Sequence, residues 1–503
     1  MLIELVLDGL VAFFSRPDLM LLSVLGVLVG IVLGALPGVS STMSLAVLLP
    51  VSYGLDPTAA MAFLLAVFVA SVYGGSISAI LLNIPGTPGA IVTQFDGYPL
   101  ARAGRAGHAL SYALIASTLG GLIGLGLLVT LAPLVARAAM NFRSPEFAMA
   151  AVFGLVLLAF ASTGSTFRAI LVGVIGLICG MVGYDTLTDI SRFDYGTASL
   201  QAGIELVPLT VGIFGLAEVL RNLSMGRSAI ARVPPLGSLF PSLASVARLW
   251  KTILRGGIIG TFVGAVPAAG SAIAVALSYA QERRLSKTPE NFGKGEPAGI
   301  AGPEAANSSG VGGSLVPMMT LGIPGDSMTA VLMGALLIHG LQPGPLLFAD
   351  DLAFVSNIYV SILIAVVLTL FLGLVLMKVI TVVMRIPPHI LMCAIGVLCI
   401  VGSYAIRNSM ADVYIMLFFG LVGYLLYAVQ VSPAPLAFGL ILGPIVEENV
   451  RRSLMLSQGS WSIFIERPIS LVLVLLTIAV LAIPAVQTIR ARRGAAAGGD
   501  TAL

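Results

Sequence analysis

A short apolar motif occurs twice in this chain, and its two copies constrain the fold more than any other feature. Gly-Ile-Val-Leu-Gly-Ala-Leu-Pro at positions 30–37 reappears as Gly-Thr-Phe-Val-Gly-Ala-Val-Pro at positions 260–267, a spacing of 230 residues. Paired hydrophobic segments that Gly and Pro interrupt at matching places in two halves are typical of the binding site of a secondary transporter. A second pair of motifs follows the first: Gly74-Gly75-Ser76 with Asn83-Ile84-Pro85-Gly86, and Gly312-Gly313-Ser314 with Gly322-Ile323-Pro324-Gly325.

The composition indicates that the chain lies in a lipid bilayer. Of its 503 residues, 58% are hydrophobic and 10% are charged, and the mean hydropathy is +1.05. A soluble domain carries roughly 25% charged residues. We therefore predict an all-α polytopic membrane protein. The net charge of +3 is small, so nucleic acid is not an expected partner. The three cysteines show no metal-ligand spacing, so neither a metal site nor a cofactor is expected.

The duplication divides the chain into two predicted repeats. They cover residues 17–225 and 247–455. Residues 1–16 are predicted to be an N-terminal interfacial segment, and residues 226–246 a linker. Residues 456–503 add one more transmembrane helix and a tail. An odd number of crossings in each repeat would give the repeats opposite orientations.

The charges in the loops favour such an inverted arrangement. Cytoplasmic loops carry an excess of Lys and Arg, and arginines near the linker and near the C-terminus place both on the cytoplasmic side. Arg102 and Arg105 follow the first broken region, whereas Asp350 and Asp351 occupy the equivalent place in the second half. The exception is the segment 451–467, which is predicted to lie outside although it contains three arginines.

Four apolar pieces are too interrupted by Gly and Pro to cross the bilayer as simple helices. Irregular backbone at membrane depth is tolerated only where protein or water satisfies its polar groups. We therefore interpret these pieces as re-entrant hairpins or broken helices: 37–52, 76–95, 268–281 and 319–327. The Gly-Gly-Ser segments are expected to be part of the breaks. The alternative for small residues at such spacing is close helix packing, and it is the favoured interpretation for the glycines at 26, 30, 34, 256, 260 and 264.

The breaks are the predicted substrate site. Proline stops a helix, and each break exposes N–H groups at one helix end and C=O groups at the other. Helix N-termini attract anions, and nearby hydroxyl groups can bind a carboxylate without a deeply buried arginine. The predicted substrate-binding residues are Ser76, Asn83, Pro85, Gly86, Thr87, Gly89, Ser314, Gly322, Pro324, Gly325 and Ser327.

A second set of polar residues could hold a coupling cation. It consists of Asn307, Ser308, Thr320 and Asp326. Charged residues at membrane depth are rare and indicate function by default, and this applies to Asp326 and also to Glu304. The alternative for Asp326 is a solvated hairpin tip. Asp96, which follows the first break, could equally line an entrance or end a hairpin.

No enzyme motif is found in the chain, and no nucleotide-binding loop, so an enzyme or a primary pump is not expected. A channel or a structural membrane scaffold is the main alternative. A pore needs rings of charge or a polar stripe through several spans, and neither is evident. An intramembrane enzyme using Asp326 and a second carboxylate is disfavoured, because no carboxylate lies at the matching position, Gly86–Thr87.

At these motifs the chain resembles the large, TctA-like transmembrane subunit of the tripartite tricarboxylate transporter family. The resemblance covers residues 17–455. It implies a bacterial inner-membrane permease that uses co-transported Na⁺ or H⁺ to import tricarboxylates, dicarboxylates or other small organic acids. The implied partners are a small four-helix membrane subunit and a periplasmic solute-binding protein. The motifs that carry it are Tyr73–Gly89, Asp96–Pro99, Pro303–Asn307 and Thr320–Gly325.

By this resemblance the loops at Asn83–Gly89 and Gly322–Ser327 hold the carboxylate. Asp326 departs from what an anion site needs and favours cation binding there. The two broken hairpins are expected to meet near mid-membrane on a mobile transport bundle that moves against a scaffold formed by the remaining spans.

Overall fold

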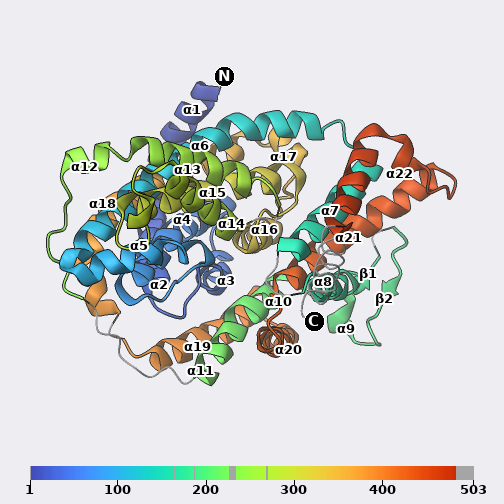
Figure 1. Cartoon of the computed structure of the whole chain (residues 1–503). Helices are drawn as coiled ribbons and strands as arrows, with labels where there is room; N and C mark the ends of the chain where they lie inside the picture. Colours follow the sequence, from blue (N-terminus) through green and yellow to red (C-terminus); the bar gives the residue numbers. More distant parts are fainter. Residues whose placement is uncertain are drawn as a thin grey trace, which may run out of the picture. The chain divides into compact units, whose positions relative to one another are not determined.

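The computed structural model describes residues 2–161, 165–185, 187–225, 234–267, 270–384 and 386–482. Nearly all regular structure in these residues is helical, which confirms the predicted all-α class (Figure 1). Among the described residues, seven helices are long and apolar enough to cross a membrane, and five shorter apolar helices accompany them. The chain is therefore a multi-pass membrane protein.

The chain forms two compact units, Met1–Met140 with Glu205–Leu425, and Asn141–Ile204 with Leu426–Leu503. They do not follow the boundaries of the two predicted repeats, because each unit contains residues from both. The repeat, linker and tail boundaries therefore stay predictions. Residues 226–233 of the linker, and the tail after residue 482, lie outside the described residues.

The first unit contains the broken segments and most of the long helices. Its helices before residue 140 are α1 (Leu2–Phe14), α2 (Pro17–Ala35), α3 (Ser41–Ser52), α4 (Pro57–Leu82), η1 (Pro88–Ala90), α5 (Thr93–Leu100), η2 (Ala101–Arg105) and α6 (Ala106–Ala139). Those after residue 205 are α10 (Leu206–Thr210), η3 (Val211–Leu216), α11 (Ala217–Ser224), α12 (Leu243–Ala247), α13 (Trp250–Gly264), α14 (Gly270–Leu285), η4 (Pro289–Asn291), α15 (Pro297–Leu321), α16 (Ser327–Ile338), α17 (Pro345–Asp350), α18 (Leu352–Val383), α19 (Pro388–Arg407) and α20 (Met410–Ala428).

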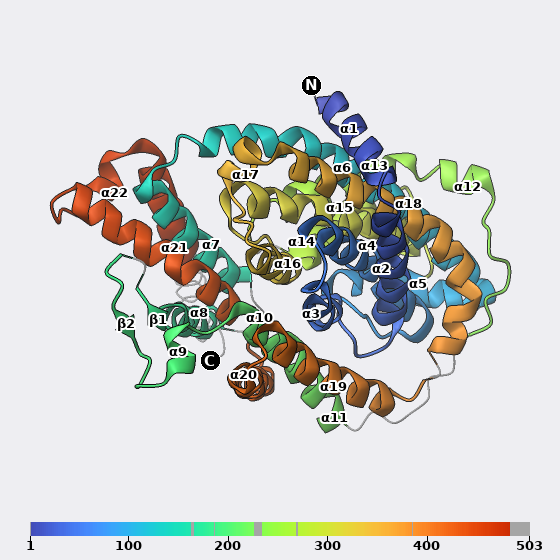
Figure 2. The same ribbon diagram turned by 180° about the vertical axis from the view of Figure 1, so that it is seen from behind.

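Glycine stripes hold α2 against α4 and α13 against α15 (Figures 1 and 2). A Cβ atom added to Gly30 would lie 2.8 Å from the carbonyl oxygen of Val67, and one added to Gly260 would lie 2.1 Å from that of Ala306. Small residues allow such close approach of two backbones, so the packing interpretation of these glycines is confirmed. The same contacts recur at Gly26 and Gly34 on α2, and at Gly256 and Gly264 on α13.

The contacts of these stripes align the two halves residue by residue. Residues of α2 correspond to residues of α13 that lie 230 positions later, as Gly34 does to Gly264. Residues of α4 correspond to residues of α15 that lie 239 positions later, as Ser71 does to Gly310. At that spacing Gly75 corresponds to Ser314. The sequence motif had instead paired Ser76 with Ser314. The two helix pairs thus share one packing pattern, and their opposite orientation in the membrane stays a prediction.

The two halves also exchange packing partners. The long helix α6 of the first half packs on α15 of the second, where Gly120 lies against Ala305 and Gly124 against Ser309. In return α18 of the second half packs on α4 of the first. Side chains from these helices form one continuous apolar core with α2 and α13. In the described residues, this core is therefore shared by the two halves.

The expected breaks are shorter than the sequence suggests. Gly74, Gly75 and Ser76 lie inside α4, and Gly312, Gly313 and Ser314 lie inside α15. The prediction that these segments interrupt their helices is therefore wrong. A helical glycine costs only about 1 kcal/mol relative to alanine, and here its missing side chain permits contact with neighbouring backbones. The regions 37–52 and 268–281 likewise contain the regular helices α3 and α14, and residues 268–269 lie outside the described residues.

The second unit contains α7 (Ser144–Ala161), α8 (Thr166–Gly180), α9 (Ala198–Gln201), α21 (Ala434–Leu456), α22 (Ile463–Glu466) and the helix Pro468–Ala482. It also contains the two-stranded antiparallel hairpin β1 (Gly183–Tyr184) and β2 (Ser191–Arg192). The glycines of α8 and α21 hold these helices together, since a Cβ atom on Gly176 would lie 2.2 Å from the carbonyl oxygen of Leu436.

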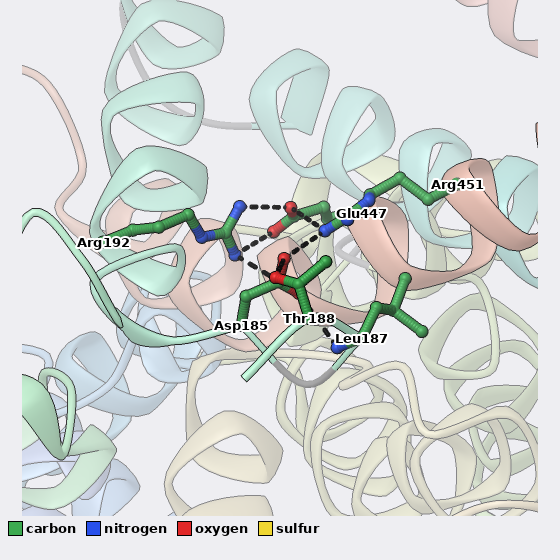
Figure 3. A network of polar contacts seen from close by, with 6 residues as sticks. All are labelled: Asp185, Leu187, Thr188, Arg192, Glu447 and Arg451. Atoms are coloured by element: carbon green, nitrogen blue, oxygen red, sulfur yellow. Dashed lines mark hydrogen bonds and ion pairs between the residues drawn. The ribbon is translucent and has the colours of Figure 1, made fainter. Parts of the chain in front are cut away.

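A network of ion pairs fastens the β1–β2 hairpin to α21 (Figure 3). Arg192 donates two hydrogen bonds to Glu447, at 2.5 and 3.0 Å, and Arg451 donates to Asp185 at 2.6 Å. Arg452 pairs with Glu448, and Arg467 pairs with Glu146. Each of the three arginines between residues 451 and 467 is therefore bound to a carboxylate. The predicted side of this segment stays untested.

The stability of this network is expected to depend on pH through Asp185. Hydrogen bonds from Thr188, Arg451 and the Leu187 amide lower the pKa of the Asp185 carboxyl. A lowered folded-state pKa gives stability that is fully present above the ordinary Asp pKa, about 3.9, and is lost as the pH falls through the lowered value. Asp185→Asn should therefore reduce thermal stability at pH 7, and the difference from wild type should shrink in acid. The matched control is Asp189→Asn, at an exposed position of the same hairpin. Equal loss in both variants would contradict the expectation.

Candidate functional site

The first break follows α4 and folds back onto it. Asn83 ends the helix in the left-handed region, with φ of 59°. The amide of Gly86 then donates to the carbonyl oxygen of Gly75 at 3.2 Å. A Cβ atom on Gly86 would lie 2.7 Å from the carbonyl oxygen of Gly34. Glycine is required here because the loop backbone lies directly on two helix backbones.

The second break repeats this geometry after α15. Gly322 ends the helix with φ of 67°, and the amide of Ile323 donates to the carbonyl oxygen of Pro317. Gly325 lies against Ser314, since an added Cβ atom would be 2.6 Å from the Cα atom of that serine. Ser314 is the counterpart of Gly75. The Pro-Gly pairs thus predicted both breaks at the correct places.

Asp326 caps the helix that follows the second break. Its carboxylate accepts a hydrogen bond from the amide of Thr329 at 2.8 Å, and the Thr329 hydroxyl group accepts one from the Asp326 amide at 2.8 Å. This reciprocal pair is a capping box at the start of α16. The cap explains an acidic residue at this position without a bound ion, so the cation role of Asp326 stays a prediction. Ser327 is the first residue of α16.

Each break lies against the long helix that precedes the break of the other half. The short helix η1 of the first break packs on α15, and α16 of the second break packs on α4. Gly89 is central to this contact, because an added Cβ atom would lie 1.9 Å from Oδ1 of Asn307. In the described part of the chain no hydrogen bond joins the two breaks to each other. Their convergence on one substrate therefore stays a prediction.

Two buried hydrogen-bond donors beside the first break have no partner. They are Oγ1 of Thr87 and Nδ2 of Asn307. Asn307 was predicted to hold a cation, but the atom without a partner is a donor, which cannot coordinate one. The Thr87 side chain is packed against Gly75, and both side chains are almost fully buried. A buried polar group without a partner calls for an explanation such as an unfilled binding site. Hydroxyl and amide groups can both donate, which suits an anionic ligand. Thr320 by contrast bonds within its own helix, to Val316.

The sequence alone did not reveal the environment of Glu304. This residue lies inside α15 with no exposed surface. Ser76 of α4 donates to its Oε1 at 2.7 Å, Ser117 of α6 donates to its Oε2 at 2.9 Å, and Thr93 of α5 donates to Oε1 as well. Ser76, predicted to bind substrate, therefore binds this carboxylate in the structure. A charged residue within a predicted membrane span was the available signal, but its partners are remote in sequence.

A narrow cavity lies beside Ser117, one of the donors to this carboxylate. It lies between α4, α6, α15 and α18 and has room for about one water molecule, about 10 Å³. Its polar lining includes Ser117, which donates to Glu304, Ser308, which was predicted to hold a cation, and Tyr73, whose buried hydroxyl group has no partner. Ser308 and Glu304 are thus neighbours on one face of α15, four residues apart.

Asp96 has a structural role instead of lining an entrance. Its Oδ1 accepts hydrogen bonds from the amides of Gly293, Gly295 and Glu296, at 2.8 to 2.9 Å. Its Oδ2 accepts one from the hydroxyl group of Tyr279 at 3.0 Å. The carboxylate thereby ties the first break to the loop that begins α15.

The sequence of the chain matches a family model over residues 20–438, and the description of that family is "Tripartite tricarboxylate transporter TctA family". The chain belongs to this family. The chain is therefore a subunit of a tripartite tricarboxylate transporter, as its motifs suggested. Membership in the TctA family indicates that the chain is a transporter subunit and not an enzyme.

Two relatives of this TctA-family chain come from Agrobacterium vitis. One, described as an uncharacterized 52.8 kDa protein in the TAR-I ttuC' 3' region, is 36% identical over 93% of both chains. The other, an uncharacterized protein in the TAR-II ttuC' 3' region, is 36% identical over 46% of this chain and 97% of its own length. Neither description names a substrate.

Proposed function

We propose that the chain is the permease subunit that imports small organic carboxylates, of the tricarboxylate or dicarboxylate class, using an ion gradient. A periplasmic solute-binding protein delivers the substrate, and a small four-helix membrane subunit completes the complex in the bacterial inner membrane. The C-terminus lies in the cytoplasm. Family membership supports the tripartite assembly. The observation that carries the substrate class is the pair of unpartnered donors, Thr87 Oγ1 and Asn307 Nδ2, beside the first break.

The proposed binding mode uses both breaks. A carboxylate group accepts hydrogen bonds from Thr87 and Asn307, and the Pro-Gly backbone at Gly86 and Gly325 approaches the substrate closely. Both breaks belong to the first unit, which supports their movement together as one transport bundle. Co-transported Na⁺ or H⁺ offsets the negative charge of the substrate and couples its uptake to the gradient.

The test is uptake of a panel of carboxylates into proteoliposomes that contain the whole complex, with Na⁺ and pH gradients imposed separately. We expect saturable, gradient-dependent uptake that requires the binding protein. Liposomes without the large subunit are the control. Ion currents with single-channel steps, or the absence of saturable uptake of every carboxylate in the panel, would favour the channel or scaffold alternative and overturn the proposal.

Thr87→Val is expected to weaken substrate binding without altering the fold. The replacement keeps the shape of the side chain and removes its donor. A hydrogen bond to a charged group contributes about 1.5–3 kcal/mol, so the half-saturating concentration should rise about tenfold or more. Uptake kinetics in the same proteoliposomes measure this. Thr130→Val, at an exposed position of α6, is the matched control, and similar kinetics for both variants would remove Thr87 from the site.

A further inference from the structure

Six acidic side chains are buried in the described part of the chain, and one of them differs from the rest. Glu146, Asp185, Glu282 and Asp412 each pair with an arginine. Asp96 accepts hydrogen bonds from three backbone amides. Glu304 alone is held only by hydroxyl groups, those of Ser76, Thr93 and Ser117.

An ionised carboxylate in this position is costly. Burying a charge is unfavourable unless a counter-charge or strong donors compensate for it, and Glu304 has no exposed surface. Neutral hydroxyl groups compensate less well than arginine. Protonation of Glu304 removes the cost and needs no additional space. A hydroxyl group can either donate or accept, so the three partners can serve both the neutral and the charged carboxyl group.

A small cavity lies beside Ser117, one of the hydroxyl donors of Glu304. The cavity has room for about one water molecule. Its lining includes Ser117 and Tyr73, and the buried hydroxyl group of Tyr73 has no partner. The charge of Glu304 acts on Tyr73 of α4, which is the titratable residue in the cavity lining. Other buried titratable groups on the surrounding helices have partners of their own: Asp96 on α5, Tyr112 on α6, and Glu282 with Arg255 between α14 and α13. Tyr359 on α18 is buried, and its hydroxyl group has no partner.

We propose that Glu304 carries the proton whose movement drives uptake. This inference rests on the proposed function and names the ion and the residue that couple it. In the outward-facing state a proton from the outer water forms an O–H bond on the Glu304 carboxylate, and the neutral residue crosses with the bound anion. On the inner side that bond breaks and the proton passes to water. No redox step is involved.

Glu304→Gln tests this, because glutamine imitates the protonated state permanently. In proteoliposomes with the complete complex, we expect the variant to retain exchange of labelled for unlabelled substrate across the membrane. We expect it to lose accumulation under an imposed pH gradient, so that internal substrate no longer rises above the external concentration. Glu290→Gln, at an exposed position, is the matched control and should accumulate substrate like the wild type.

The outcomes separate the inference from the proposed function. Accumulation by Glu304→Gln under a pH gradient, or wild-type accumulation that responds to Na⁺ alone, overturns the role of Glu304 while leaving carboxylate transport intact. Absence of carboxylate exchange in the wild type overturns the proposed function itself. If Glu304→Gln does not fold, infrared spectra of the wild type and of Ser117→Ala, compared over a range of pH, test whether Glu304 takes up a proton. The C=O band of a protonated carboxyl group should titrate at a shifted pH in Ser117→Ala, and an unshifted band or no such band overturns the inference.

Discussion

Leucine at Gly86 or at Gly325 is expected to abolish uptake while leaving the protein in the membrane. At both positions even a Cβ atom collides with backbone, 2.7 Å from the carbonyl oxygen of Gly34 for Gly86 and 2.6 Å from the Cα atom of Ser314 for Gly325. Flexible side chains can move away from an added group, but the backbone of a packed helix cannot do so cheaply. Overpacking costs roughly 1–3 kcal/mol or more, and the loop that carries the proposed substrate contacts must shift to relieve it.

Uptake by purified complexes in proteoliposomes measures this effect, and membrane extraction of the variants shows that they insert. Gly126→Leu is the matched control, because nothing lies within 4 Å of an added Cβ atom at this position of α6. We expect the control to retain wild-type uptake. Normal uptake in both Gly86→Leu and Gly325→Leu would show that neither break takes part in transport.

Asp96→Ala is expected to destabilise the first unit strongly. The substitution removes the acceptor of three backbone amides in the loop before α15, and it also frees the Tyr279 hydroxyl group. An unpaired donor costs about 1–3 kcal/mol when it is fully buried, and these donors are only partly buried. We therefore expect the free energy of unfolding to fall by about 3 kcal/mol in total. The expected result is a large fall in the temperature of thermal unfolding of the detergent-solubilised protein.

Asp96→Asn separates the shape of this side chain from its charge. The amide oxygen can still accept hydrogen bonds from the loop, so the fall in unfolding temperature should be smaller than for alanine. Asp350→Ala provides the control at an exposed carboxylate, where surface changes are usually within about 0.5 kcal/mol. If Asp96→Ala and Asp350→Ala unfold at the same temperature, the carboxylate of Asp96 does not hold the loop.

The membrane class and the positions of the two breaks could be predicted from sequence because both depend on local properties. The helices α4 and α15 end just before Pro85–Gly86 and Pro324–Gly325, where proline and glycine together favour a stop. The continuation of α4 through Gly74–Ser76 could not be predicted in the same way. It depends on the tight contact with α2, which no local pattern in α4 reveals.

The environment of Glu304 could not be predicted from the sequence for a related reason. Its three hydroxyl partners are separated from it by 187 to 228 positions along the chain. Serine and threonine are common in membrane helices, and their presence does not indicate which group they bind. Only the arrangement of α4, α5 and α6 around α15 brings them to one carboxylate. The same holds for the exchange of partners between the two halves, which a motif spacing does not indicate.

That exchange has a consequence for how the chain can be divided. If the protein were made as two separate polypeptides cut within residues 226–246, each product would expose the helix surface that the other normally covers. The second fragment would also carry Glu304 stripped of all three of its hydroxyl donors. Only simultaneous synthesis of both fragments would then yield active complex, and either fragment made alone would be degraded.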